Sequence, residues 1–104
     1  MTVKTTVNGG KLTIFLHGEL DHHGARVAMS GIEDKINVIL PRDCVLDLGG
    51  LSFMDSSGIA VILKTYKRVN EIGGRMWVEN VPKQPMKVLD ASGIERVVRI
   101  TALS

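Results

Sequence analysis

Alternating apolar and polar residues at the start of the chain predict two β-strands, at 2–7 and 11–17. The residues that would share one face of each strand are Val3, Thr5 and Val7, then Leu12, Ile14 and Leu16. The segment 8–10 between them reads Asn-Gly-Gly, and Asn-Gly is a strong signal for a tight hairpin turn. The N-terminal residues therefore predict an antiparallel hairpin.

Apolar residues at spacings of three and four then predict three helices. The first follows Asp21, a suitable N-cap, and stops before Pro41; the second begins at Ser56 or Ser57. The third has Pro85 in its first turn. Gly73-Gly74 and Gly93 are the expected stops of the second and third helices. The apolar stripes are Ala25, Ala28, Met29, Ile32, Ile36, Ile39 and Leu40, then Ile59, Ile62, Leu63, Tyr66, Val69 and Ile72, then Met86, Val88 and Leu89.

Three further strands are expected between and after these helices, at 44–48, 75–78 and 97–100. We expect residues 49–55 to form a loop and 81–83 a turn. The order is β-β-α-β-α-β-α-β, and helical crossovers join strands in parallel. The sequence thus predicts an α/β fold in a single domain, 1–104. It has a small mixed β-sheet, first an antiparallel hairpin and then parallel strands, covered by α-helices.

Composition narrows the function classes. Apolar residues make up 44% of the chain, and only four are aromatic, so the core must be aliphatic. The net charge of +2, from 13 basic and 11 acidic residues, is too balanced to predict nucleic-acid binding. Lys64, Lys67 and Arg68 fall at helical spacing, which is typical of a solvated helix face. Tyr66 and Trp77 stand on different elements, which favours packing over base stacking.

The single cysteine, Cys44, excludes an intrachain disulfide and fits a reducing compartment. No apolar run approaches the roughly 20 residues of a membrane helix, and the N-terminus does not resemble a signal peptide. We therefore expect a soluble cytoplasmic protein.

The candidate chemistry lies in the segment 51–60, Leu-Ser-Phe-Met-Asp-Ser-Ser-Gly-Ile-Ala, which follows a buried strand and opens a helix. Binding sites of α/β sheets lie at the carboxyl ends of parallel strands. The free N–H groups and positive end of a helix favour an anion. The alternative interpretation is structural, because Asp-Ser-Ser-Gly is also a common way to cap a helix.

Four segments together resemble the STAS domain of bacterial anti-sigma factor antagonists, and the sporulation-type antagonist in particular. They are Gly18–His23, Leu51–Leu63, Gly73–Gly74 and Val88–Ile94. The resemblance runs from about Val3 to Ile100, nearly the whole chain.

The resemblance implies a phosphorylation switch rather than an enzyme. In this family the serine after the aspartate, here Ser56, is phosphorylated by the anti-sigma factor, which is a serine kinase. The unphosphorylated antagonist binds that kinase and frees the sigma factor, and a serine phosphatase resets the system. The implied partner face consists of Glu19, Asp21, Met54, Asp55, Ser56, Ser57 and Gly58.

Roles within this segment follow from the same resemblance and from residue type. Asp55 would set the loop and contact the kinase, Ser57 would cap the helix, and Gly58 would allow close approach. Met54 would form an apolar rim. The protein itself would need no metal or organic cofactor, because ATP and magnesium belong to the kinase. Nucleic acid and membrane are not expected partners.

Three alternatives remain open. A serine hydrolase would use Ser56 with His22 or His23 as base, but Met54 stands where the nucleophile elbow needs glycine. A metal site would draw on His17, His22, His23 and Cys44, which lack the usual ligand spacing. Another STAS role, as a scaffold in stress-signalling complexes or a lipid-transporter subunit, would be revealed by its co-purifying partner.

Overall fold

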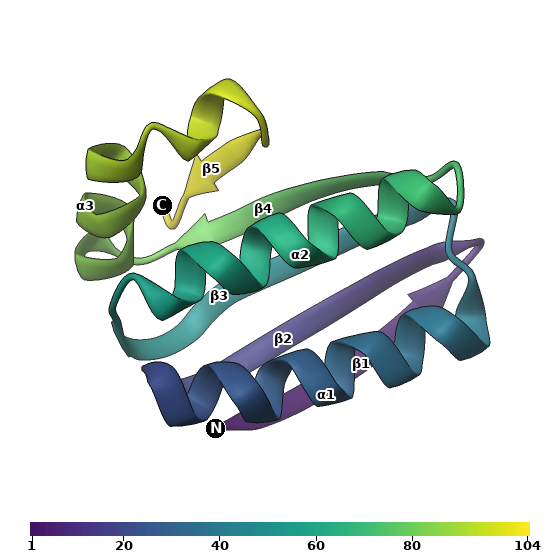
Figure 1. Ribbon diagram of the computed structural model, residues 1–104, viewed down its shortest axis with the longest axis horizontal. Coiled ribbons are helices and arrows are strands. Elements are labelled where there is room, and N and C mark those ends of the chain that lie inside the picture. The colour runs from purple at the N-terminus through teal and green to yellow at the C-terminus, as the bar shows by residue number, and fades with distance from the viewer.

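Five strands form one sheet in the order β1-β2-β3-β4-β5, and helices connect the later strands (Figure 1). The computed structural model describes residues 1–104. Its strands are β1 (Thr2–Asn8), β2 (Lys11–Leu20), β3 (Asp43–Met54), β4 (Arg75–Val81) and β5 (Ile100–Ala102). Its helices are α1 (His22–Ile39), α2 (Ser57–Glu71) and α3 (Lys83–Ser92), followed by a 3₁₀ turn at Ile94–Arg96. The predicted element order is confirmed.

The strand directions also follow the prediction. β1 and β2 pair antiparallel, with Asn8 opposite Lys11 at the turn. Gly9 and Gly10 take positive φ angles of 56° and 82°, which glycine adopts without steric cost. The pairs β2–β3, β3–β4 and β4–β5 are parallel. The sheet is therefore mixed, with the antiparallel hairpin at one edge.

Helices α1 and α2 lie side by side on one face of the sheet, and α3 lies near the end where β3 and β4 finish (Figure 1). The inward residues of β2, Leu12, Ile14 and Leu16, are fully buried beneath them. The α1 stripe is confirmed at Ala28, Ile32 and Ile36, which are all buried.

Two residues of the predicted helical stripes differ from expectation. Leu40 is 60% exposed and adopts a left-handed conformation with φ 49°, so it ends α1 instead of packing under it. Leu63 is 41% exposed, while Val61 and Thr65 are buried. The α2 stripe is therefore confirmed at Ile62 and Val69 and shifted toward Val61 and Thr65.

The largest correction concerns β2 and β3, which run further than predicted. Of the segment 49–55, only Asp55 lies outside a strand, because β3 continues to Met54 and pairs with β2 up to Leu20. Its two glycines look loop-like in sequence, but register shifts along the β2–β3 pair accommodate the extra residues as bulges. Hydrogen bonding to the neighbouring strand, which no local pattern reveals, keeps this segment extended.

The last elements are displaced as well. β4 extends to Val81 instead of ending at residue 78, and α3 begins at Lys83. The expected strand at 97–100 begins only at Ile100, because the preceding residues form the 3₁₀ turn. Val98 is buried after this turn while Val97 is 52% exposed, so the apolar pair marks a turn packed on the core.

Candidate partner-binding site

The candidate site lies where β2 and β3 end side by side, at the end of the sheet where α1 and α2 begin (Figure 1). Glu19 is opposite Phe53 and Leu20 is opposite Met54 in this parallel pair. The Asp55 N–H donates to the carbonyl oxygen of Leu20 at 3.3 Å. Two segments that are more than thirty residues apart in sequence are thereby joined at the carboxyl end of β2 and β3.

Asp21 caps α1, as predicted. Its Oδ1 accepts a hydrogen bond from the Gly24 N–H at 2.8 Å. Gly24 is buried, and a side chain there would collide with the carbonyl oxygen of Glu19. Asp21 is half-buried, so this carboxylate is partly accessible from outside. The sharp β2–α1 junction thus places Glu19 and Asp21 next to the end of β3.

Asp55, and not Ser57, caps α2. The Ser57 N–H donates to Asp55 Oδ1 at 2.8 Å. Ser56 occupies the N-cap position with helical angles (φ −63°, ψ −17°), and its hydroxyl makes no capping hydrogen bond. The expectation that Ser57 caps the helix was wrong, because Ser57 is already the first helical residue. The Ser56 hydroxyl is consequently not committed to holding the helix.

The two adjacent serines face different surroundings. Ser56 is exposed and lines a shallow cavity of about 470 Å³ together with Lys87 and Ser92. Ser57 is half-buried and lines a separate cavity between α1 and α2, beside His22. Ser56 is therefore the more accessible of the two hydroxyls, and a lysine lies on its side of the helix.

Met54 and Gly58 lie beneath the surface. Met54 is fully buried, so the expectation of an apolar rim at this residue was wrong. Gly58 is buried too, and a Cβ there would lie only 2.5 Å from Met54 Cγ and Sδ and 3.0 Å from Leu20 Cδ2. The close approach that Gly58 permits is thus to the domain's own core. Neither residue belongs to the accessible face in this conformation.

Sequence reasoning missed two residues of this region. Phe53, whose outward position follows from the pairing of β3, is 40% exposed beside the exposed Glu19. Gln84 of α3 holds Met54 through two hydrogen bonds, from the Met54 N–H to Oε1 and from Nε2 to the Met54 carbonyl, both 2.9 Å. The apolar side chain of Phe53 next to a polar segment was a signal in the sequence, but its outward direction depends on the pairing of β3. No local signal identified Gln84.

The alternative chemistries find little support in the geometry. Neither serine hydroxyl hydrogen-bonds to a histidine, and His22 shares a cavity with Ser57 instead of Ser56. No group of three or more histidine, cysteine, aspartate or glutamate side chains comes together. Cys44 is fully buried, and burial raises the pKa of its thiol to about 12. None of the helices is long and apolar enough to cross a membrane.

Comparison with known proteins agrees with this fold. The family model of the STAS domain matches residues 2–103. The anti-sigma F factor antagonist of Paenibacillus polymyxa is 40% identical over 91 residues, which cover 88% of this chain and 78% of that protein. The chain therefore belongs to the STAS-domain family and groups with the anti-sigma factor antagonists.

Solved structures extend the comparison to both signalling forms of one relative. The anti-sigma factor antagonist SpoIIAA in its unphosphorylated form aligns with a TM-score of 0.79 and 27% identity. The alignment covers 95% of this chain and 87% of that one. SpoIIAA of Bacillus in its phosphorylated form aligns with a TM-score of 0.70 and 29% identity, over 95% and 90% of the two chains.

Proposed function

We propose that this protein is an anti-sigma factor antagonist switched by phosphorylation of Ser56. In its unphosphorylated form it binds an anti-sigma factor that is a serine kinase, and the sigma factor is released to direct transcription. The kinase transfers the γ-phosphoryl group of ATP to the Ser56 hydroxyl and the complex dissociates. A serine phosphatase restores the binding form. The existence of a phosphorylated form of SpoIIAA supports this proposal.

The observation that carries the proposal is the state of the Ser56 hydroxyl. It is exposed, it makes no hydrogen bond within the domain, and Asp55 caps α2 in its place. Modification of Ser56 therefore removes no interaction that stabilises the fold. The start of α2 tolerates the added negative charge, because the helix dipole favours an anion there by about 0.3–1 kcal/mol.

The switch would act on the partner and not on the fold. Phosphorylation adds about 1.5 to 2 negative charges near neutral pH. They would join the carboxylates of Glu19, Asp21 and Asp55 on one face, which a partner fitted to a small neutral hydroxyl must then desolvate. A loss of about 4 kcal/mol would weaken binding roughly a thousandfold. On this proposal Phe53 is the apolar contact of the face.

Phosphorylation by an anti-sigma factor serine kinase with magnesium and ATP, followed by mass-spectrometric site mapping, tests the proposal. We expect one phosphate on Ser56, its loss in Ser56→Ala, and its retention in Ser57→Ala. Ser56→Ala should stay bound to the kinase, and Ser56→Asp should bind much more weakly. Phosphate on Ser57, or unchanged affinity of Ser56→Asp, would overturn the assignment.

A further inference from the structure

The outer edge of β4 is only half covered. β5 pairs with the second half of β4, where Val78 lies opposite Ile100 and Val81 opposite Ala102. The Val78 N–H donates to the carbonyl oxygen of Arg99 at 2.9 Å. No residue of β5 pairs with the part of β4 that precedes Val78. The first residues of β4 therefore form an uncovered edge of the sheet.

Backbone groups at this edge lack partners. The Arg75 N–H points toward β3, where it donates to the carbonyl oxygen of Arg42 at 2.8 Å. Successive residues of a strand direct their backbone groups to opposite edges, so those of Met76 point outward, as those of Val78 do. No backbone hydrogen bond joins Met76 to the segment that leads into β5. The N–H donor and the carbonyl acceptor of Met76 are thus unpaired on the side that faces away from β3.

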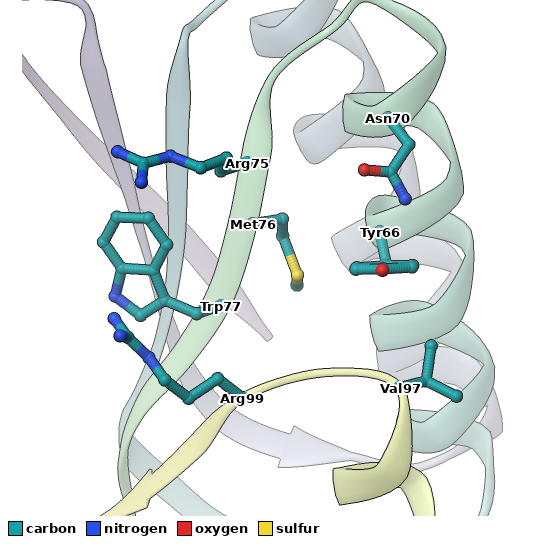
Figure 2. A pocket seen from close by; sticks show the side chains of 7 residues that line it. All are labelled: Tyr66, Asn70, Arg75, Met76, Trp77, Val97 and Arg99. Carbon is teal, nitrogen blue, oxygen red and sulfur yellow. The ribbon is translucent and has the colours of Figure 1, made fainter.

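A cavity of about 400 Å³ lies along this edge. Figure 2 shows Met76 on one side of β4, pointing toward Tyr66 of α2, with Val97 below them. Trp77 and Arg99 lie on the opposite side of the strand. An extended segment places successive side chains on opposite faces. One side chain would therefore reach the apolar Met76 side, and the next the Trp77 side.

The Trp77 side of the edge is basic. Lys11 Nζ lies 5.7 Å and Arg99 Cζ 5.0 Å from the centre of the Trp77 ring. Arg75 is highly exposed, and its Nε forms an ion pair with Asp43 Oδ1 at 3.1 Å. Glu79 also lies on this side, where its carboxylate accepts a hydrogen bond from Trp77 Nε1 at 2.6 Å and offsets one of the positive charges. Lys11 and Arg99 have no carboxylate partner, so this side favours an anionic group.

We propose that the open edge of β4 binds an extended peptide segment of a partner protein in which an acidic residue adjoins an aliphatic one. The segment adds a short strand next to Met76, in line with β5. Its aliphatic side chain enters the cavity beside Tyr66, and its acidic side chain meets Arg99. Recognition thus combines two backbone hydrogen bonds with one apolar and one charged contact.

Charge favours this occupant over a second copy of the chain. Pairing two copies along this edge would bring Arg75 and Arg99 of one copy against the same arginines of the other, which is unfavourable. The edge is also separate from the phosphorylation face. Tyr66 lies ten residues along α2 from Ser56, a distance of about 15 Å. The two surfaces are therefore formed by different residues.

The probe for this proposal is the peptide acetyl-Thr-Val-Asp-Val-Thr-amide, and the matched control carries Lys in place of Asp. Trp77 is the only tryptophan, so its fluorescence reports on the edge directly, together with the Met76 amide resonance in NMR titrations. We expect the Asp peptide to shift both signals at millimolar concentration. It should bind about tenfold more tightly than the Lys peptide, because the Lys side chain would be repelled by Arg99, and this ratio corresponds to about 1.4 kcal/mol.

Charge reversal on the protein completes the test. Arg99→Glu should invert the preference between the two peptides, as read from the Met76 amide, while Arg26→Glu on α1 should leave it unchanged. Equal binding of both peptides, or no shift of the Met76 amide, would overturn the proposal. A concentration-dependent dimer that shifts Met76 without peptide would assign the edge to a second copy. A stronger response of Trp77 to oligothymidylate would assign it to nucleic acid.

Discussion

The side chain of Gln84 closes two hydrogen bonds with the backbone of Met54, both 2.9 Å long. The amide of Gln84 thereby acts like one residue of a neighbouring strand and ties α3 to the last residue of β3. Asp55 and Ser56 follow immediately. The position of the Ser56 hydroxyl thus depends on a contact between residues thirty positions apart.

Replacing Gln84 should make the backbone at Met54, just before Ser56, less rigidly held. Gln84→Ala removes both bonds, and we expect the free energy of unfolding in urea to fall by about 1 kcal/mol. Amide hydrogen exchange at Met54 should accelerate more than exchange in β2. Gln84→Glu retains an acceptor but faces the Met54 carbonyl with a carboxylate, so it should not restore stability. Lys83→Ala is the control. Equal exchange rates of the Met54 amide in Gln84→Ala and Lys83→Ala would contradict the role of Gln84.

The Gly58→Ala substitution tests whether helix propensity or core packing decides the change in stability at this position. Helix propensity alone predicts that alanine stabilises α2 by about 1 kcal/mol. The structure predicts the opposite, because the new Cβ would lie 2.5 Å from Met54 Cγ and Sδ, and Met54 is fully buried. We expect a loss of about 1–3 kcal/mol in the free energy of unfolding. The exposed Lys64→Ala on the same helix should change it by less than about 0.5 kcal/mol. A stabilised Gly58→Ala would disprove the packing argument.

The Cys44 thiol should make stability decline in alkaline solution. Its pKa is raised from 9.0 to about 12 by burial, so the unfolded chain loses this proton first as the pH rises. The contribution of the Cys44 thiol to the free energy of unfolding is fully present below pH 9. It falls by about 1.4 kcal/mol per pH unit between pH 9 and 12. The difference between wild type and Cys44→Ala isolates this contribution from other groups. Parallel pH profiles of the two proteins would refute it.

The same burial predicts an unreactive thiol. A thiol reagent should label Cys44 only as fast as the domain opens, because the thiolate is the reactive form. Labelling in denaturant should be rapid. Rapid labelling of the folded protein at neutral pH would mean that Cys44 is accessible.

Phe53 should contribute to partner binding with little effect on folding. Because 40% of its side chain is exposed, Phe53→Ala should cost much less stability than truncation of a buried side chain. In titrations with the anti-sigma kinase we expect at least about a tenfold loss of affinity, equivalent to about 1.4 kcal/mol. Val38→Ala near the far end of α1, where 78% of the side chain is exposed, is the control. Equal affinities of the two variants would remove Phe53 from the partner face.

Lys87 should respond to a phosphate on Ser56, because both residues line one cavity. A nearby cation favours the dianion and lowers the pKa of the phosphoserine. In a protein carrying phosphoserine at position 56, Lys87→Gln should raise that pKa in a ³¹P NMR titration. Lys64→Gln, which alters the cavity beside Ser57, should leave it unchanged. A larger effect of Lys64→Gln would place the phosphate on the other side of α2.

Short-range signals were sufficient for much of the fold. The Asn-Gly-Gly turn, the Asp21 cap and the glycine after α3 each specify a local backbone conformation, and the structure places all three as predicted. The local signal failed where neighbouring strands decide the conformation. Residues 49–54 contain glycines and polar side chains typical of loops, yet pairing with β2 holds most of them in a bulged strand.

For the candidate site too, local signals predicted some features and contacts between distant residues decided the others. The residue types of 55–58 and their place before a helix are properties of the sequence, and they indicated a candidate site there, while the resemblance to the STAS family selected Ser56. Which residue caps α2 depended on the path of the chain between β3 and α2. The burial of Met54 and Gly58 depended on how the end of β3 packs beneath the first turn of α2. Gln84 could not be inferred, because its partner is thirty residues away.

The sequence by itself determined the order of elements, the parallel arrangement after the first hairpin, and the serine at the start of α2. The order of elements follows from periodicity and turn signals, which act within a few residues, and the parallel arrangement follows from the helical crossovers between strands. Only the tertiary structure decided that Asp55 frees the Ser56 hydroxyl, that Phe53 faces outward beside Glu19, and that Met76 lies at an open edge. The reason is physical: exposure and hydrogen bonding depend on neighbours that folding brings together from distant parts of the chain.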